Sequence, residues 1–186
     1  MLLKELNTAS YPLRRYVISE GDNHSINKME EFERGLEMFA VFYGMDYGRY
    51  DYKIVPRARR IHQSLLSTPG TALLTFTACL RVFRISFEQG RTDTPYPDLV
   101  IANGPATAFI LICAAFVLRY LALSGTGDSL RCIYIESWAR LHTLSLTGKL
   151  LRACGLCDRF LVQWPDLEVH NSRRPQLGEY HGPLVI

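Results

Sequence analysis

Short apolar runs with strand character alternate with longer helical stretches, and this alternation restricts the possible fold more than any other feature of the chain. Apolar strands separated by helices form parallel βαβ units, because each crossover helix returns the chain to the same edge of the sheet. The sequence therefore predicts an α/β fold with a Rossmann-like parallel sheet. The expected strands cover residues 15–19, 52–55, 98–101, 132–135 and 160–162.

The length and composition of the chain suit one such domain. Its 186 residues are 48% apolar and 21% charged, which is typical of a globular protein with a sizeable core. We expect residues 1–186 to form a single Rossmann-like domain. The net charge of +3 is too small to indicate a nucleic-acid-binding protein, so no nucleic acid partner is expected. The expected helices cover residues 25–34, 71–87, 106–123 and 144–151.

The sequence predicts neither a metal site nor a cofactor. The five cysteines are an odd number without the spacing of a disulfide framework, which favours a reducing compartment. Cys154 and Cys157 have CxxC spacing, but there is no second pair for zinc, so we interpret both as packed residues. The histidines form no ligand pair, and His142 is expected to make a structural hydrogen bond. The chain contains no Walker loop, GxGxxG turn or nucleophile elbow.

The turn after residues 98–101 is a candidate ligand site. Ligands of parallel α/β sheets bind beyond the carboxyl ends of the strands. Asn103 and Gly104 lie between a strand and a helix that Pro105 begins, so free backbone N–H groups at the helix N-terminus would face an anion such as phosphate. An ordinary βα turn without a ligand explains the same residues, and both interpretations stay open.

Residues 106–123 are nearly long and apolar enough to cross a bilayer. Arg119 interrupts the segment, and a strand precedes it directly through a tight turn. We therefore expect a helix that packs on the sheet and not a membrane span.

Residues 71–87 combine large apolar side chains with arginines. A helix lying in a membrane interface explains this pattern, and so does an ordinary packed helix. On the first interpretation, a basic rim would face the bilayer together with the apolar face of the helix. The residues of this basic rim are Arg57, Arg59, Arg60, Arg81 and Arg84.

Three stretches taken together resemble a known family. They are PDLVIANGP at residues 97–105, YIES at 134–137 with TLSLTGK at 143–149, and DRFLVQWP at 158–165. In this order they resemble the membrane-anchoring subunits of the eukaryotic UDP-GlcNAc transferase of dolichol-linked oligosaccharide assembly, the asparagine-linked glycosylation protein fourteen family. The resemblance covers essentially the whole chain.

The resemblance implies a fold and a function. In this family the chain is the N-terminal, acceptor-side half of a two-domain GT-B-type glycosyltransferase, and a separate catalytic subunit carries the UDP-GlcNAc site. Together the subunits add the second GlcNAc to GlcNAc-diphosphodolichol during N-glycan precursor synthesis, on the cytosolic face of the endoplasmic reticulum. The expected partners are the catalytic GlcNAc-transferase subunit, the endoplasmic reticulum membrane and the dolichol-linked acceptor. The chain by itself is expected to be non-catalytic.

The resemblance also implies a longer N-terminal region. Family members begin with a membrane anchor, a first strand and a glycine-rich loop of the type GSGGHTxEM, whereas residues 1–6 resemble the helix after that loop. We therefore expect the anchor, the first strand and the loop to be missing, through either an N-terminal truncation or degeneration of the chain. The strand at residues 98–101 is expected to be central in the sheet.

Candidate site residues follow from the expected strand ends and from the resemblance. Glu136 is the candidate catalytic carboxylate, which would bind a sugar hydroxyl or assist its deprotonation. A structural hydrogen bond from Glu136 to the adjacent loop is the alternative. Asn103, Gly104 and Ser137 are the candidate contacts of the acceptor and its phosphates.

The chain ends in three large apolar residues, Leu184, Val185 and Ile186. Chain ends are usually frayed and polar unless something holds them. We expect this tail to pack at the interface with the catalytic subunit, and a short edge strand in the chain's own sheet is the alternative.

Two other functions are compatible with the sequence. A self-sufficient small α/β enzyme could bind a nucleotide or a phosphorylated sugar, and a scaffold could retain the fold without the chemistry. Activity of the chain without a partner would favour the enzyme. Complex formation that is unaffected by substitution of Glu136 or Asn103 would favour the scaffold.

Overall fold

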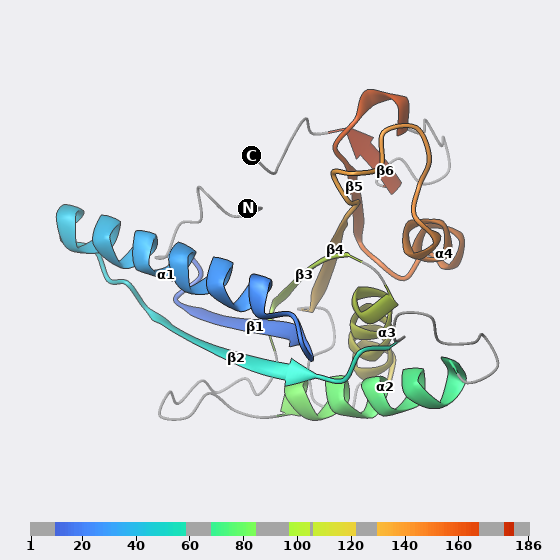
Figure 1. The fold of residues 1–186 in the computed structure, drawn as a ribbon, viewed down its shortest axis with the longest axis horizontal. Helices are drawn as coiled ribbons and strands as arrows, with labels where there is room; N and C mark the ends of the chain where they lie inside the picture. The colour runs from blue at the N-terminus through green and yellow to red at the C-terminus, as the bar shows by residue number, and fades with distance from the viewer. Residues whose placement is uncertain are drawn as a thin grey trace. The chain divides into compact units, whose positions relative to one another are not determined.

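The computed structural model describes residues 10–58, 68–84, 97–104, 106–121, 130–167 and 177–180. Strands alternate with helices along these residues (Figure 1). Two compact units meet in the sequence between Val55 and Pro56, and each contains its own parallel sheet. The predicted α/β class with parallel strands is confirmed. The prediction of a single domain concerns how these units pack together, and it stays a prediction.

The first unit is a βαβ arrangement of β1 (Leu13–Ser19), α1 (Asn23–Tyr43) and β2 (Arg49–Val55). The two strands pair in parallel along their whole lengths, with α1 as the crossover. Both strands predicted in this region are present, and α1 is longer than the predicted helix at residues 25–34.

Local sequence explains where α1 begins and ends. The carboxylate of Asp22 accepts hydrogen bonds from the backbone N–H of Ser25 at 3.1 Å and from its hydroxyl at 2.7 Å, which caps the first turn. Gly44 ends the helix with a left-handed φ of 61°. Gly35 inside the helix costs about 1 kcal/mol relative to alanine, which is too little to stop the helix before Tyr43.

A buried ion pair joins α1 to β1. Nε and Nη2 of Arg14 donate to the two carboxylate oxygens of Glu33 at 2.9 and 2.7 Å. The hydroxyls of Tyr16 and Tyr47 donate to the same carboxylate. Burial by itself would raise the pKa of the Glu33 carboxyl, but the hydrogen bonds from Arg14 and the two tyrosines outweigh it and hold that pKa below its usual range.

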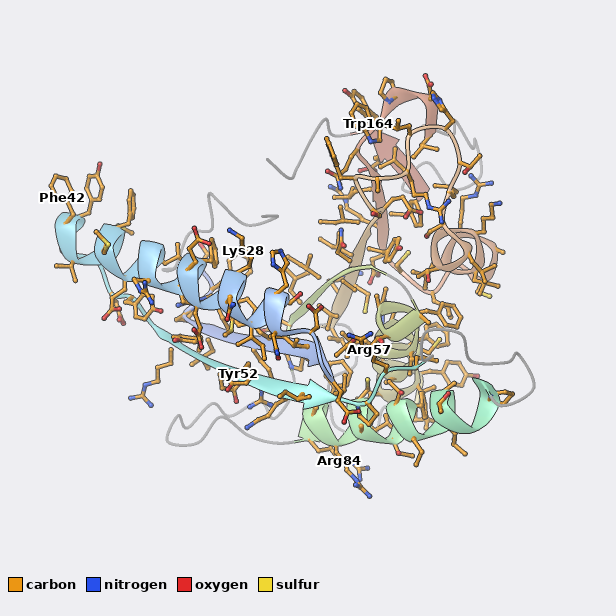
Figure 2. The ribbon with its side chains drawn as sticks, viewed as in Figure 1. Lys28, Phe42, Tyr52, Arg57, Arg84 and Trp164 are labelled. Carbon is orange, nitrogen blue, oxygen red and sulfur yellow. The ribbon has the colours of Figure 1, made fainter. Side chains whose placement is uncertain are left out.

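The C-terminal end of α1 exposes large apolar side chains. Phe42 is 81% exposed and lies at the far end of the helix in Figure 2. Its ring lies 5.0 Å from that of Tyr43, which in turn lies 4.4 Å from Phe39. An exposed aromatic cluster of this kind is typical of surfaces that contact a protein or a membrane.

The second unit contains a four-stranded parallel sheet in the order β3-β4-β5-β6. Its strands are β3 (Leu99–Asn103), β4 (Arg131–Ile135), β5 (Arg159–Val162) and β6 (Leu177–Tyr180). Among the described residues β3 pairs with β4 alone and therefore ends the sheet. The prediction that this strand is central is wrong, because strand order depends on long-range pairing, which the local apolar pattern does not specify.

Three helices and one short 3-10 turn accompany this sheet. They are α2 (Thr68–Arg84), α3 (Ala106–Tyr120), α4 (Leu146–Cys154) and the 3-10 turn η1 (Pro165–Leu167). α3 contacts β3 and α2 and buries residues such as Ile112, Ala115 and Leu118. The prediction that this apolar segment packs inside the protein is therefore confirmed. In the described part of the chain, no helix combines the length and the hydropathy needed to cross a bilayer.

Candidate functional site

The carboxyl ends of β3, β4 and β5 lie at one edge of the second unit's sheet, because neighbouring strands are parallel. We call this the carboxyl edge. The turn at Gly104 follows β3, the loop that begins with Glu136 follows β4, and Gln163 follows β5. The structure thus brings the candidate residues Asn103, Gly104, Glu136 and Ser137 to a single edge.

The turn after β3 leaves open space at the start of α3. Gly104 has a φ of 108°, and a Cβ atom placed on it would have no neighbour within 4 Å. The Tyr134 hydroxyl, at the end of β4, donates to the Gly104 carbonyl at 3.2 Å and holds the turn in place. The side chain of Asn103 is exposed, and α3 begins at Ala106, so backbone N–H groups of its first turn lie beside this open space.

The carboxylate of Glu136 is fully buried and joins two segments of the backbone. Its Oε1 accepts the backbone N–H of Ser137 at 2.8 Å. Its Oε2 accepts the backbone N–H of Ser145 at 3.1 Å and the hydroxyl of the same residue at 3.0 Å. Ser145 is the N-cap of α4, and its Oγ accepts the backbone N–H of Gly148 at 2.9 Å. Glu136 therefore fixes the loop after β4 to the N-terminus of α4.

These contacts are structural hydrogen bonds of the kind expected as the alternative role of Glu136. A direct catalytic role would require the carboxylate to leave Ser137 and Ser145, and that role stays a prediction. The roles of Tyr134, Ser145 and Gly148 in this network were not predicted. The signal available for the cap was Ser145 directly before an amphipathic run, since serine is a preferred N-cap residue.

Three side-chain hydrogen bonds join the loop after β4 to the segment after β5. The buried Gln163 amide donates to the Glu136 carbonyl, and the Trp164 indole N–H donates to the Trp138 carbonyl, both at 2.8 Å. Nδ1 of His142 lies 3.0 Å from Oδ2 of Asp166. The predicted structural hydrogen bond of His142 is therefore present. Together these contacts hold the two segments side by side at the carboxyl edge.

Three of the cysteines are buried and Cys113 is half-buried, but Cys154 is exposed, so the interpretation of Cys154 as a packed residue is wrong. Burial raises the pKa of the Cys157 thiol to about 11 and that of Cys132 to about 12, so both stay protonated at neutral pH. Cys154 is exposed and forms no disulfide with Cys157. No three His, Cys, Asp or Glu side chains gather into a metal-binding group within the part of the chain that the structure describes.

The structure separates part of the basic rim from the carboxyl edge. Arg57 is half-buried, and Arg84 is exposed at the C-terminal end of α2. Figure 2 places Arg84 and Trp164 at opposite ends of the second unit. Arg59 and Arg60 lie outside the described residues, as do Leu184, Val185 and Ile186.

The two faces of α2 differ in burial. One face is buried and includes Thr75, Cys79, Val82 and Phe83. The other face is exposed and includes Leu73, Leu74, Thr77, Arg81 and Arg84. Because Phe83 points inward, the apolar residues that accompany the exposed arginines are the two leucines, 63% and 64% exposed. The helix is thus packed on one side and presents leucines and arginines on the other.

Comparison with known proteins identifies relatives over nearly the whole chain. The family described as "Oligosaccharide biosynthesis protein Alg14 like" matches residues 1–180. The "UDP-N-acetylglucosamine transferase subunit alg14" of Aspergillus fumigatus is 37% identical over 97% of this chain and 96% of the relative. The subunits of the same name from Yarrowia lipolytica and Homo sapiens are 37% and 34% identical, over 99% and 95% of this chain and 73% and 74% of the relatives. No solved structure matches the chain.

Proposed function

This chain belongs to the Alg14 family of oligosaccharide biosynthesis proteins, and from this membership we propose that it is the acceptor-side subunit of a UDP-N-acetylglucosamine transferase. In this role it joins a catalytic subunit that binds UDP-GlcNAc. The complex adds the second GlcNAc to GlcNAc-diphosphodolichol in N-glycan precursor synthesis, on the cytosolic face of the endoplasmic reticulum. The observation that carries the proposal is the similarity to relatives named as transferase subunits, one of them over 96% of its length.

The carboxyl edge supports the acceptor side of this function. An acceptor that carries a diphosphate needs backbone N–H donors and room for the phosphates. The Gly104 turn supplies the room, and the start of α3 supplies the donors. We assign Asn103, Gly104 and Ser137 to the acceptor and its phosphates. Glu136 holds Ser137 in this arrangement.

The relatives' names favour a subunit over a self-sufficient enzyme, because each is called a transferase subunit. A subunit of this kind needs a surface for its catalytic partner. We propose the apolar tail Leu184 to Ile186 for that surface, on the strength of its three large side chains.

Co-expression with the catalytic GlcNAc-transferase subunit of the same organism tests the proposal. We expect the two chains to co-purify, and the complex to transfer GlcNAc from UDP-GlcNAc to a GlcNAc-diphospho-lipid, whereas each chain alone is inactive. Deletion of Leu184 to Ile186 is expected to abolish co-purification and to leave the far-UV circular dichroism spectrum unchanged. Activity of this chain without the partner would contradict the subunit role, and undiminished capture by the shortened chain would place the interface elsewhere.

The exposed face of α2 supports the membrane part of the proposal. Arginines near an anionic surface contribute about 1 kcal/mol each, so replacing Arg81 and Arg84 by glutamine is expected to weaken vesicle binding roughly thirtyfold. The exposed leucines add apolar burial in the interface. Flotation with vesicles containing an anionic lipid measures this binding at low and high salt.

Lys149→Gln is the matched control for the vesicle experiment, because it removes an exposed cation from α4 of the same unit. We expect this variant to bind vesicles like the unmodified chain. If the double arginine variant also binds normally, and its binding is insensitive to salt, the bilayer does not contact this face of α2. Extending the substitutions to Arg57, Arg59 and Arg60 tests the rest of the basic rim.

A further inference from the structure

We infer that Trp138 and Trp164 form a platform for a pyranose ring, and that its ligand is the N-acetylglucosamine of the lipid diphosphate acceptor. This inference rests on the proposed function and adds the sugar-binding subsite to it. It is carried by an aromatic pair at the carboxyl edge, by the hydrogen bonds between the two segments that bear the pair, and by the Gly104 turn at the same edge.

The two indoles contact each other at the carboxyl edge. Their ring centroids lie 5.9 Å apart, and the ring planes are inclined by 43°. Trp138 is 52% exposed although tryptophan is among the side chains that gain most from burial. Trp164 is half-buried, and its indole N–H is used in the hydrogen bond to the Trp138 carbonyl. The pair therefore presents apolar ring surface to solvent, and the indole N–H of Trp164 is already paired.

The platform is held in place before any ligand arrives. The hydrogen bonds from Gln163 to Glu136, from Trp164 to Trp138, and between His142 and Asp166 join the two segments at three points. A side chain that is already ordered loses little freedom when a ligand binds, so more of the contact energy contributes to affinity. The hydrogen bond between the two tryptophans fixes the Trp164 indole and the backbone of Trp138, so little freedom is lost there on binding.

The position of the platform matches the chemistry of the acceptor. The platform lies at the ends of β4 and β5, whereas the Gly104 turn lies at the end of β3. Adjacent strands are spaced by about 4.8 Å, so β3 and β5 are about 10 Å apart. In the acceptor the sugar is bonded directly to the diphosphate. A phosphate cradle and a ring platform at neighbouring strand ends would therefore engage both parts of one molecule.

A pyranose is suited to such a surface because one face of the ring presents C–H groups, which pack on an aromatic plane, while its hydroxyls and N-acetyl group point outward to polar partners. Trp138 supplies the plane for the C–H face of the ring. The platform positions the acceptor sugar and takes part in no bond-making step.

Tryptophan fluorescence of the full chain tests ring binding directly, because the chain contains only two tryptophans and both are in the platform. The probes are a short-chain GlcNAc-diphospho-lipid, free GlcNAc and inorganic diphosphate. We expect a saturable change in emission with the sugar-bearing lipid, and with free GlcNAc at higher concentration, but none with diphosphate. An equal change with diphosphate, or no change with either sugar, would overturn the inference.

Kinetics of the complex with its catalytic subunit test the role of the platform in transfer. Trp138→Ala is expected to raise the KM for the lipid acceptor about tenfold, with little change in the KM for UDP-GlcNAc or in partner capture. Trp138→Phe keeps an aromatic plane and is expected to recover most of the loss. Tyr120→Ala is the matched control, because it removes an aromatic ring that is 78% exposed at the C-terminal end of α3, away from the carboxyl edge.

The outcomes separate this inference from the proposed function. An inactive unmodified complex would contradict the proposed function, and the fluorescence experiment would still test the platform. An active complex in which Trp138→Ala leaves the acceptor KM unchanged would overturn the platform alone. A rise confined to the KM for UDP-GlcNAc would assign the ring to the donor and overturn the acceptor assignment. Circular dichroism of Trp138→Phe and Trp138→Ala verifies that both variants are folded.

Discussion

Glu33→Ala is expected to lower the free energy of unfolding by about 3–5 kcal/mol, because it leaves the buried Arg14 guanidinium without its partner. The side chains of Arg14 and Glu33 are 5% and 1% exposed, so water cannot replace the lost carboxylate. Tyr16 and Tyr47 also lose the acceptor of their hydroxyl hydrogen bonds. Urea unfolding followed by circular dichroism measures the change.

Two further variants make the test of the ion pair specific. Glu31→Ala removes an exposed carboxylate from the same helix, one that pairs with Lys28 at the surface, and is expected to change stability little. Replacing both Arg14 and Glu33 by apolar residues of similar size is expected to cost less than Glu33→Ala, because no charge is left buried alone. Equal decreases in the free energy of unfolding for Glu33→Ala and Glu31→Ala would show that the buried pair stabilises the chain no more than the exposed pair does.

The lowered pKa of Glu33 determines how the stability of the folded chain changes with pH. A carboxyl whose pKa is lower in the folded chain than in the unfolded chain contributes stability above its unfolded value of about 4.3, and this contribution is lost as the pH falls through the folded value. The unmodified chain should therefore lose more stability than Glu33→Gln when the pH is lowered below about 4.

Gly148→Ala is expected to destabilise the second unit and to reduce activity of the complex. A Cβ atom at this position would overlap Oε2 of Glu136 and lie 3.1 Å from Cζ of Phe160. The Glu136 carboxylate is fully buried and held by Ser145, so it has nowhere to move without breaking those hydrogen bonds. Overpacking costs about 1–3 kcal/mol, and each lost hydrogen bond to a charged group adds about 1.5–3 kcal/mol.

Gly70→Ala is the control for the substitution at Gly148, because both glycines lie in helices of the second unit. A Cβ atom at Gly70 would meet nothing within 4 Å. Alanine there is expected to stabilise the chain slightly, by up to about 1 kcal/mol. Thermal unfolding and the transferase assay, run on both variants, compare the two sites. A Gly148→Ala chain as stable and active as Gly70→Ala would contradict the role of Glu136 as the link between the β4 loop and α4.

The local pattern of the sequence determined the class of the fold. Apolar runs between helices predicted parallel strands, and the five predicted strands lie within β1 to β5 or overlap them. The apolar segment of α3 was correctly assigned to the interior, because Arg119 and the preceding strand are visible in the sequence itself. The Asn103–Gly104 turn was placed at a strand end because it follows the apolar run at residues 98–101. These features depend on periodicity and on neighbours in the chain, which are local properties.

The tertiary structure alone decided which strands are neighbours and which side chains meet. β3 ends the described sheet, although its sequence is that of a buried strand, because strand order depends on pairing between distant segments. Glu136 and Ser145 are nine residues apart, and Arg14 and Glu33 nineteen, and no local pattern predicts that each pair forms buried hydrogen bonds. Trp138 and Trp164 lie twenty-six residues apart and meet because β4 and β5 are adjacent and parallel. The sequence therefore determined the elements from β1 to β5, but β6 was not predicted. The arrangement of the carboxyl edge required the long-range contacts that only the folded chain makes.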